Sequence, residues 1–221
     1  MTRGVADSPL GRLIRAPRLA PAAAEEERCE LCGQPIGPGH RHLMDVPAQA
    51  LLCACRACSV LFDRREAGGR HYRLVPDRSW RVEGFELSDA TWTGLRVPVG
   101  LAFFRHVTPA ERVVAFYPGP MGATEAPLDP DDWARIEAGN PVLRAMEADV
   151  EALLVNRVRG AREHWLVPVD ACYRLVGVMR RHWRGLGGGT EVWDAIDGFF
   201  RELRERSRTA GREGRPGGSA A

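Results

Sequence analysis

The sequence predicts an α+β fold in which a small cysteine-rich module precedes an antiparallel sheet packed with three or four helices. Three observations lead to this prediction. Five of the six cysteines fall within residues 29–58. Runs of β-branched and aromatic residues separated by turn residues follow, between residues 71 and 118. Apolar residues at helical spacing then dominate the C-terminal half of the chain.

The composition divides the chain into four parts. Residues 1–27 are rich in Arg, Pro and Ala without periodicity, so we expect a disordered leader. Residues 28–66 contain the cysteine cluster and two histidines and are expected to form the module. Residues 70–206 are expected to form the α+β domain, and the Gly- and Arg-rich residues 207–221 a disordered tail.

The bulk composition limits the classes of function. The chain has 221 residues, of which 44% are hydrophobic, which is enough for a substantial core. The formal net charge is only +2, so there is no basic field to attract nucleic acid. No apolar run suits a signal peptide or a membrane span, and we therefore expect a cytoplasmic protein without membrane insertion. In a reducing compartment, clustered cysteines favour a metal site over disulfides.

In the larger domain, the best strand signal is a hairpin. Residues 95–107 (LRVPVGLAFFRHV) and 112–118 (RVVAFYP) are joined by a turn-like Thr-Pro, which predicts two antiparallel strands. Asp129 or Asp131 is then expected to cap a short helix through Trp133 and Ile136.

The following segments alternate between predicted helices and one strand. Residues 140–154 have apolar residues at helical spacing after Asn-Pro, which predicts a helix whose acidic face (Glu147, Asp149 and Glu151) is solvated. Residues 164–169 (HWLVPV) predict a strand. Residues 171–183 and 191–206 predict two amphipathic helices, capped by Asp170 and Thr190 and separated by GLGGGT.

Two Cys-x2-Cys pairs form the strongest functional signal. Cys29 and Cys32, followed by Gly33, are typical of a metal-binding knuckle, and Cys55 and Cys58 supply a second pair. Four thiolates make a tetrahedral site that suits zinc. Because such a site has no open position for water or substrate, the expected role of the metal is structural. The alternative is a set of unrelated buried cysteines.

The ligand set has three alternates. Cys53 competes with Cys55, and His40 and His42, which face the same way on a strand, are candidates to replace two thiolates. An iron–sulfur cluster is the alternative cofactor. The ligand order, Cys-Cys, then His-His, then three cysteines, differs from the alternating Cys and His of Rieske centres.

A knuckle, a hairpin over residues 40–54 and a helix carrying the second cysteine pair resemble a treble-clef zinc finger. This frame also occurs in HNH nucleases, which need a general-base His and a His or Asn on the following helix. His42 matches the first requirement, but residues 59–69 (SVLFDRREAGG) contain neither His nor Asn. A nuclease is therefore the third choice of function.

A nucleophilic cysteine is the remaining catalytic candidate. Cys172 would need His164 or His182 as its base. Because Cys172 lies on the apolar stripe of its predicted helix, we expect an inert buried thiol instead.

Several motifs together resemble one family of uncharacterised proteins. These are CELC, HRHLMD, LLCACRACSVLF, VPVGLAFF, VVAFYPGPMGATE, NPVLRAMEADVEALLVNR and LVPVDACYRLVGVMRRHWRGLGGGTEVWDAIDGFF, within residues 28–204. The family is found mainly in actinobacteria, and its genes lie beside those for high-affinity nickel–iron hydrogenases. The resemblance implies a non-catalytic accessory protein that assists assembly or maturation of such a hydrogenase, with hydrogenase subunits or other maturation factors as partners. The alternative is an iron–sulfur electron carrier that serves the same enzyme.

Overall fold

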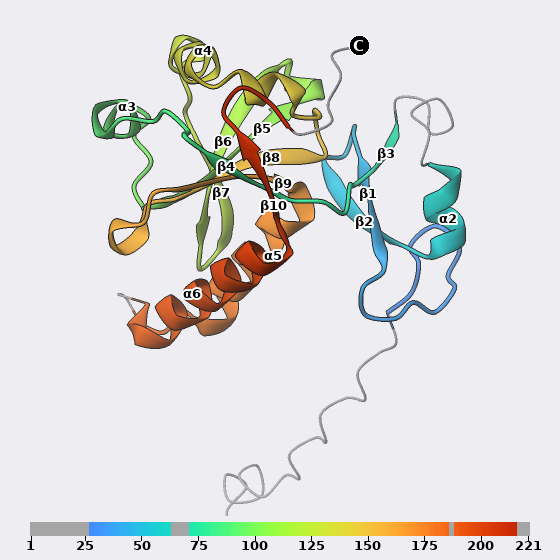
Figure 1. Cartoon of the computed structure of the whole chain (residues 1–221). Coiled ribbons are helices and arrows are strands. Elements are labelled where there is room, and N and C mark those ends of the chain that lie inside the picture. Colours follow the sequence, from blue (N-terminus) through green and yellow to red (C-terminus); the bar gives the residue numbers. More distant parts are fainter. Residues whose placement is uncertain (1–26, 63–70, 186–187, 216–221) are drawn as a thin grey trace, which may run out of the picture.

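The computed structural model describes residues 27–62, 71–185 and 188–215. Residues 1–26 of the predicted leader lie outside the described residues. The chain forms a small three-stranded sheet beside a larger seven-stranded sheet with helices on both of its faces (Figure 1). Within the described ranges, we find no helix with the length and apolar character needed to cross a membrane.

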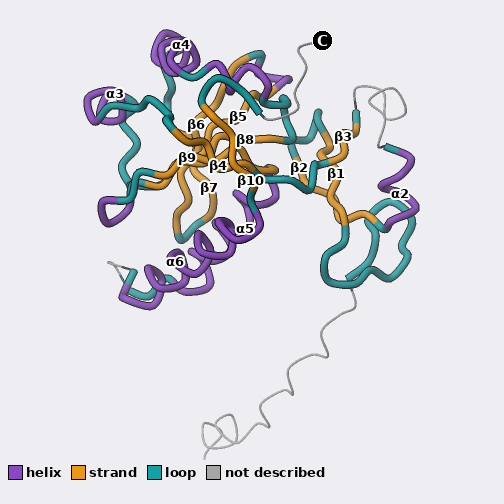
Figure 2. The backbone as a smooth tube through the Cα atoms, viewed as in Figure 1, coloured by secondary structure: helices purple, strands orange, loops and turns teal. Residues whose placement is uncertain are grey.

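The small sheet contains the predicted hairpin. Strands β1 (Arg41–Asp45) and β2 (Ala50–Ala54) are antiparallel, and helix α2 (Arg56–Leu61) follows directly. Strand β3 (Tyr72–Leu74) completes the sheet by pairing with the other edge of β1. Residues assigned from sequence to the start of the larger domain therefore contribute to the small sheet (Figure 2).

The large sheet has the strand order β10-β4-β9-β8-β5-β6-β7. Every neighbouring pair is antiparallel except β10 and β4, which are parallel. The hairpin predicted around Thr108-Pro109 is confirmed as β5 and β6. The strands are β4 (Trp80–Glu83), β5 (Leu101–Val107), β6 (Arg112–Gly119), β7 (Gly122–Ala126), β8 (Glu151–Asn156), β9 (Glu163–Pro168) and β10 (Arg208–Gly211).

Four α-helices belong to the described part of the larger domain, which confirms the α+β class. They are α3 (Asp89–Gly94), α4 (Pro130–Gly139), α5 (Val169–His182) and α6 (Gly189–Arg206), and short 3-10 turns cover Thr108–Ala110, Pro141–Ala145 and Val158–Gly160. Asp129 caps α4 as predicted. The N-cap of α5 is Pro168 and that of α6 is Gly188, so Asp170 and Thr190 do not cap these helices.

Neighbouring residues of β5 point into two separate cores. Phe103 packs among residues of α5 and α6, whereas Phe104 stacks on Trp133 of α4, with ring centroids 5.8 Å apart. The side chains of a strand alternate between the two faces of its sheet, so the part of β5 that is covered on both faces, residues 101–104, is apolar at every position. The sheet is therefore the middle of three layers, as Figure 1 shows.

The helix predicted over residues 140–154 is wrong. Residues 141–145 form only a 3-10 turn, and Glu151–Asn156 form the central strand β8. All six residues of β8 are buried. A strand buried on both faces has a continuous apolar run, and over a short stretch such a run also satisfies helical spacing.

The predicted solvated acidic face is therefore wrong as well. The Glu151 side chain is fully buried and makes a bidentate ion pair with Arg215, with N–O distances of 3.1 and 2.7 Å. The Asp149 carboxylate, 1% exposed, accepts hydrogen bonds from the backbone N–H and hydroxyl of Thr108. These charges fix the connection into β8 instead of facing water.

The predicted disordered tail begins with an ordered strand. Residues 208–211 form β10, which pairs with β4 at the edge of the large sheet, and Ala210 is buried there. The composition suggested disorder because this segment has few apolar residues. The segment is ordered mainly by backbone hydrogen bonds to β4, which do not depend on apolar side chains. Residues 216–221 lie outside the described ranges.

A small apolar cluster joins the two sheets. Met44 and Val46 of the module pack with Val75, with Val150 before β8 and with Val169 at the start of α5. Figure 1 shows the small sheet lying between α2 and the large domain. One face of the small sheet therefore contacts the large domain, and the other face supports α2 and the cysteine pairs.

His164 on β9 makes stability depend on pH. Burial, helped by the positive charges of Arg157 and Arg162, lowers the pKa of its imidazole from 6.5 to about 4. Because the folded state disfavours the charged imidazole, its contribution is present above the unfolded pKa and is lost as the pH falls through the folded pKa. We expect about 3 kcal/mol of unfolding free energy to be lost between about pH 6.5 and 4.

Urea unfolding at pH 7 and pH 4 measures this effect. The His164→Gln variant has no titrating imidazole, so the difference in its stability between the two pH values should be smaller than in the wild type. Equal differences for the two proteins would show that another group causes the pH dependence.

Candidate metal centre

The first cysteine pair lies on a tight turn before the small sheet. The N–H of Gly33 donates to the carbonyl of Cys29 at 2.8 Å, and Gly33 has a positive φ of 74°. A residue with a side chain is strained in this conformation, which explains the glycine after Cys32. The turn holds Cys29 in a buried position and Cys32 at the surface.

The second pair lies at the start of α2. Cys55 is the N-cap residue, and its sulfur accepts a hydrogen bond from the N–H of Cys58 at 3.4 Å. Cys58 is three residues further, on the first turn of the helix, and therefore lies on the same side as the cap. The helix start thus presents two sulfurs together.

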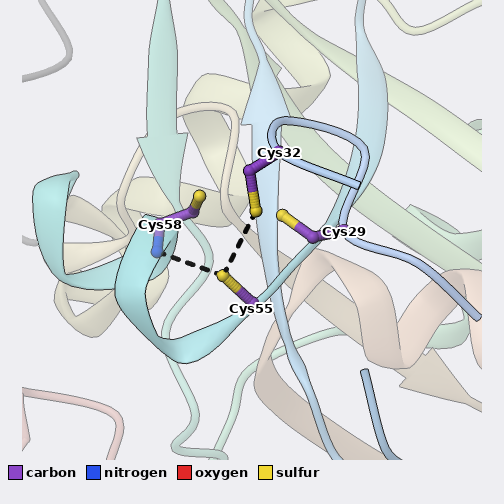
Figure 3. A group of neighbouring side chains, drawn as sticks. All are labelled: Cys29, Cys32, Cys55 and Cys58. Carbon is purple, nitrogen blue, oxygen red and sulfur yellow. Dashed lines mark hydrogen bonds between the residues drawn. The ribbon is translucent and has the colours of Figure 1, made fainter. Parts of the chain in front are cut away.

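The structure brings these four predicted ligands together. One ligand atom from each of Cys29, Cys32, Cys55 and Cys58 lies within 4.8 Å of the others. Figure 3 shows the sulfurs of Cys29, Cys32 and Cys55 turned toward one another with Cys58 beside them; the Cys32–Cys55 sulfur distance is 3.7 Å. The cluster can hold a metal ion such as zinc, or iron in an iron–sulfur site.

The spacing fits a single ion. Sulfurs placed 2.3 Å from one zinc ion at the corners of a tetrahedron are about 3.8 Å apart. The Cys32–Cys55 distance of 3.7 Å matches this edge. Two thiolates that share one iron of a [2Fe–2S] cluster are equally close, so this single distance does not distinguish zinc from an iron–sulfur site.

Backbone groups favour a negative charge at the buried end of the centre. Burial alone would raise the pKa of Cys29, but hydrogen bonds from the backbone of Cys55, Leu31 and Cys32 outweigh it and lower the pKa to about 6. Side-chain hydrogen bonds with Cys32 and Cys55, followed by burial, raise the pKa of Cys58 to about 12. A cysteine binds metal as the thiolate, so Cys29 is better prepared to bind than Cys58.

The three alternate ligands form a cluster of their own. One ligand atom from each of His40, His42 and Cys53 lies within 4.8 Å of the others. His42 and Cys53 are opposite each other in the β1–β2 register. The side chains of Leu43 and Ala54 are buried with Cys29 and Cys58, whereas Met44 and Leu51 pack toward the large domain. Because strand side chains alternate, His42 and Cys53 point away from the four-cysteine centre.

Asp170 is the residue of this second cluster that the sequence did not reveal. Its Oδ2 lies 3.0 Å from Nδ1 of His42, across 128 positions of sequence. The sequence pattern assigned Asp170 to helix capping because Asp near a predicted helix start is common there. Only the packing of the small sheet against α5 brings it to His42.

The catalytic alternatives lack a surrounding site. Cys172 is completely buried in the core beneath α5 and α6, and burial, followed by the negative charge of Asp170, raises its pKa. It therefore remains a protonated thiol, as expected for a structural cysteine. Helix α2 contains neither His nor Asn, and residues 63–70 lie outside the described residues.

The comparisons with known proteins place the chain in one family. The family model described as a family of unknown function (DUF5947) matches residues 28–207, which include the small sheet, all strands of the large sheet except β10, both clusters and all the described helices. Neither the comparison with curated proteins nor that with solved structures found a match. Because the match spans most of the 221 residues, the chain belongs to the DUF5947 family.

Proposed function

We propose that this protein is a non-catalytic accessory protein in which one zinc ion, held by Cys29, Cys32, Cys55 and Cys58, stabilises the N-terminal module. The observation that carries the proposal is the convergence of two cysteine pairs at a spacing that fits one ion. Four thiolates fill the coordination sphere of zinc, so this ion would have no position for substrate. Its role would be to hold the knuckle and α2 in place.

We further propose that the partner is a nickel–iron hydrogenase or one of its maturation factors, in the cytoplasm. This step rests on the resemblance of the sequence motifs to proteins encoded beside such hydrogenases. A docking surface is available on the module, because Val60 and Leu61 of α2 are 67% and 62% exposed. Neighbouring exposed apolar residues on a small helix favour a protein partner over water.

An iron-containing electron carrier is the second candidate. The same four thiolates suit an iron–sulfur cluster, whose irons prefer tetrahedral sulfur coordination. The backbone hydrogen bonds around Cys29 support it, because such bonds tune the potential of iron–sulfur centres. The two candidates differ in the bound metal and in visible absorption: the zinc protein is colourless, whereas the iron protein is coloured.

One purification separates these candidates and tests the partner. Full-length protein isolated anaerobically from cells that produce a nickel–iron hydrogenase is expected to contain zinc, to have no visible absorption and to retain hydrogenase subunits or maturation factors. Iron with visible absorption that bleaches on reduction would establish the electron carrier instead. Hydrolysis of nucleic acid with a divalent metal, abolished in His42→Ala, would establish a nuclease.

Matched variants make the partner test specific. Val60→Asp with Leu61→Asp should abolish co-purification without loss of zinc, because both side chains are exposed. Met121, 92% exposed between β6 and β7, provides a control: Met121→Asp removes an even more exposed apolar side chain far from α2 in sequence and should leave co-purification unchanged. Equal retention by both variants would contradict docking through α2.

A further inference from the structure

We infer that His40, His42 and Cys53 form a second metal site, which binds a divalent transition metal of the zinc class and keeps one coordination position open toward a cavity. This site goes beyond the proposed function, because it does not involve the four-cysteine centre. The inference rests on the convergence of three ligands, on how each imidazole is held, and on the cavity that they line.

The small sheet places these ligands together by its register. His42 on β1 and Cys53 on β2 are directly opposed, and His40 precedes His42 by two positions. Residues two apart on an extended chain point to the same face, so all three side chains meet on the side of the large domain. Their ligand atoms lie within 4.8 Å of one another, and the two imidazole centroids are 4.8 Å apart.

The His40 imidazole is oriented as in a metal ligand. Its Nδ1 lies 3.1 Å from the carbonyl oxygen of Gly37 and 3.5 Å from a carboxylate oxygen of Glu27. These contacts favour a proton on Nδ1 and leave Nε2 as a free lone pair. Nε2 is buried and has no hydrogen-bond partner. A buried nitrogen without a hydrogen-bond partner is unfavourable unless its lone pair binds a ligand such as a metal ion.

The His42 imidazole is held in the same way by Asp170. The contact of 3.0 Å between Nδ1 and the Asp170 carboxylate leaves Nε2 available for the ion. A carboxylate behind the imidazole fixes its tautomer and strengthens it as a ligand, which is the usual arrangement in zinc sites. Asp170 is therefore a positioning residue, and it links the site to the first turn of α5.

The donor set selects the class of metal. Two imidazoles and one thiolate suit zinc and related divalent transition metals rather than magnesium or calcium. Three protein ligands leave the fourth tetrahedral position for an exogenous ligand. This set therefore differs in kind from the closed four-thiolate centre on the other face of the same sheet.

A cavity of about 610 Å³ accepts the exogenous ligand. His40, His42 and Cys53 line it together with Asp170, Arg174 and Arg206. The two arginines come from α5 and α6; Arg206 also pairs with Glu202 at 3.7 Å, whereas Arg174 packs its guanidinium over the Phe199 ring, so Arg174 is the main source of positive charge among them. A water molecule or a small oxygen anion such as a carboxylate or phosphate is therefore the ligand class that the open position would take.

Metal titration of the full-length protein tests the inference. Metal-free protein titrated with Co²⁺ is expected to bind two equivalents, and His42→Ala and Cys53→Ser are each expected to bind one. The two substitutions lie on different strands, so a folding defect in one variant does not decide the result. Circular dichroism shows whether each variant is folded. Cys172→Ser changes a cysteine outside both clusters and should still bind two equivalents. A single equivalent in the wild type, or two in both variants, would overturn the inference.

The spectrum separates this result from the proposed function. Cobalt bound by four thiolates gives stronger sulfur charge-transfer absorption than cobalt bound by one thiolate, so the two sites are counted independently. Loss of the strong bands in Cys32→Ser reports on the four-cysteine centre, and the weaker bands should be lost with them because the strands that carry His42 and Cys53 unfold with the module. Loss of only the weaker bands in His42→Ala reports on the second site.

Two further measurements test the positioning residue and the open position. Asp170→Asn should weaken cobalt binding at the second site by about 10–100-fold and leave the four-thiolate bands unchanged. Azide, as a probe anion, should shift the cobalt bands of the wild type but not those of His42→Ala. Unchanged affinity in Asp170→Asn would remove its positioning role, and unchanged bands with azide would show that the coordination position is closed.

Discussion

The Cys29→Ser variant is expected to lose the metal of the four-cysteine centre and to unfold the module while the large sheet stays folded. The apolar core around the centre is small: its buried members are Cys29, Leu43, Ala54 and Cys58. A core of this size cannot hold a fold alone, and structural zinc contributes about 10–16 kcal/mol of apparent binding free energy. The larger domain has two extensive cores of its own and does not depend on this ion.

Hydrogen exchange followed by mass spectrometry, with metal analysis, measures this effect. Amides of β1, β2 and α2 should lose protection, and those of β5, β8 and β9 should keep it. Cys172→Ser provides the matched control, since it makes the same chemical change outside both clusters and should leave the module protected. Unchanged metal at the four-cysteine centre and unchanged protection in Cys29→Ser would contradict the ligand assignment.

Arg215→Ala is expected to lower the free energy of unfolding by about 3–5 kcal/mol. The Glu151 carboxylate that it pairs with is completely inaccessible, and Arg215 itself is only 10% exposed. Removal of the guanidinium leaves a buried charge that keeps the hydrogen bond from the backbone N–H of Glu147 at 2.9 Å but has lost its ion pair. Urea unfolding at neutral pH gives the difference directly.

An exposed ion pair supplies the control for this measurement. Arg112 and Glu125 lie 2.8 Å apart on β6 and β7 but are 47% and 53% exposed. Water screens such a pair, so Arg112→Ala should change stability by about 1 kcal/mol or less. The double variant Glu151→Gln with Arg215→Ala should recover part of the loss, because no buried charge remains. Equal effects of the two arginine substitutions would show that burial of the Glu151 pair is not important.

Elements defined by neighbouring residues were predictable from the sequence. The β5–β6 hairpin, the α4 cap at Asp129 and the knuckle before Gly33 each depend on a few consecutive residues. The cysteine pairs were also predictable as a cluster, because Cys-x2-Cys spacing itself brings two sulfurs together. Local chemistry was sufficient for these features.

Elements defined by tertiary pairing were not predictable in the same way. The run around β8 satisfies helical and buried-strand patterns equally, and only its place between β5 and β9 decides between them. Strand β10 has little apolar character and forms because β4 offers an unpaired edge. Both depend on partners far away in the sequence.

The placement of the two metal-ligand clusters on opposite faces of the small sheet was only partly predictable from the sequence. Alternation along the predicted hairpin would have placed His42 and Cys53 on one face and Ala54 on the other, given the observed register. The contribution of Asp170 depends on how the small sheet packs against α5, which no local pattern encodes. The sequence thus contained the ligands of the second cluster but not the residue that orients one of them.

The pairing of β10 with β4 has a consequence for synthesis on the ribosome. Strand β4 is made early, but its outer neighbour β10 consists of residues 208–211, which are made after every other strand of the large sheet. Until those residues leave the exit tunnel, β4 presents free backbone N–H and carbonyl groups to other nascent chains. Completion of the large sheet therefore waits for residues 208–211, and a nascent chain that stalls before them would be prone to aggregate through this edge.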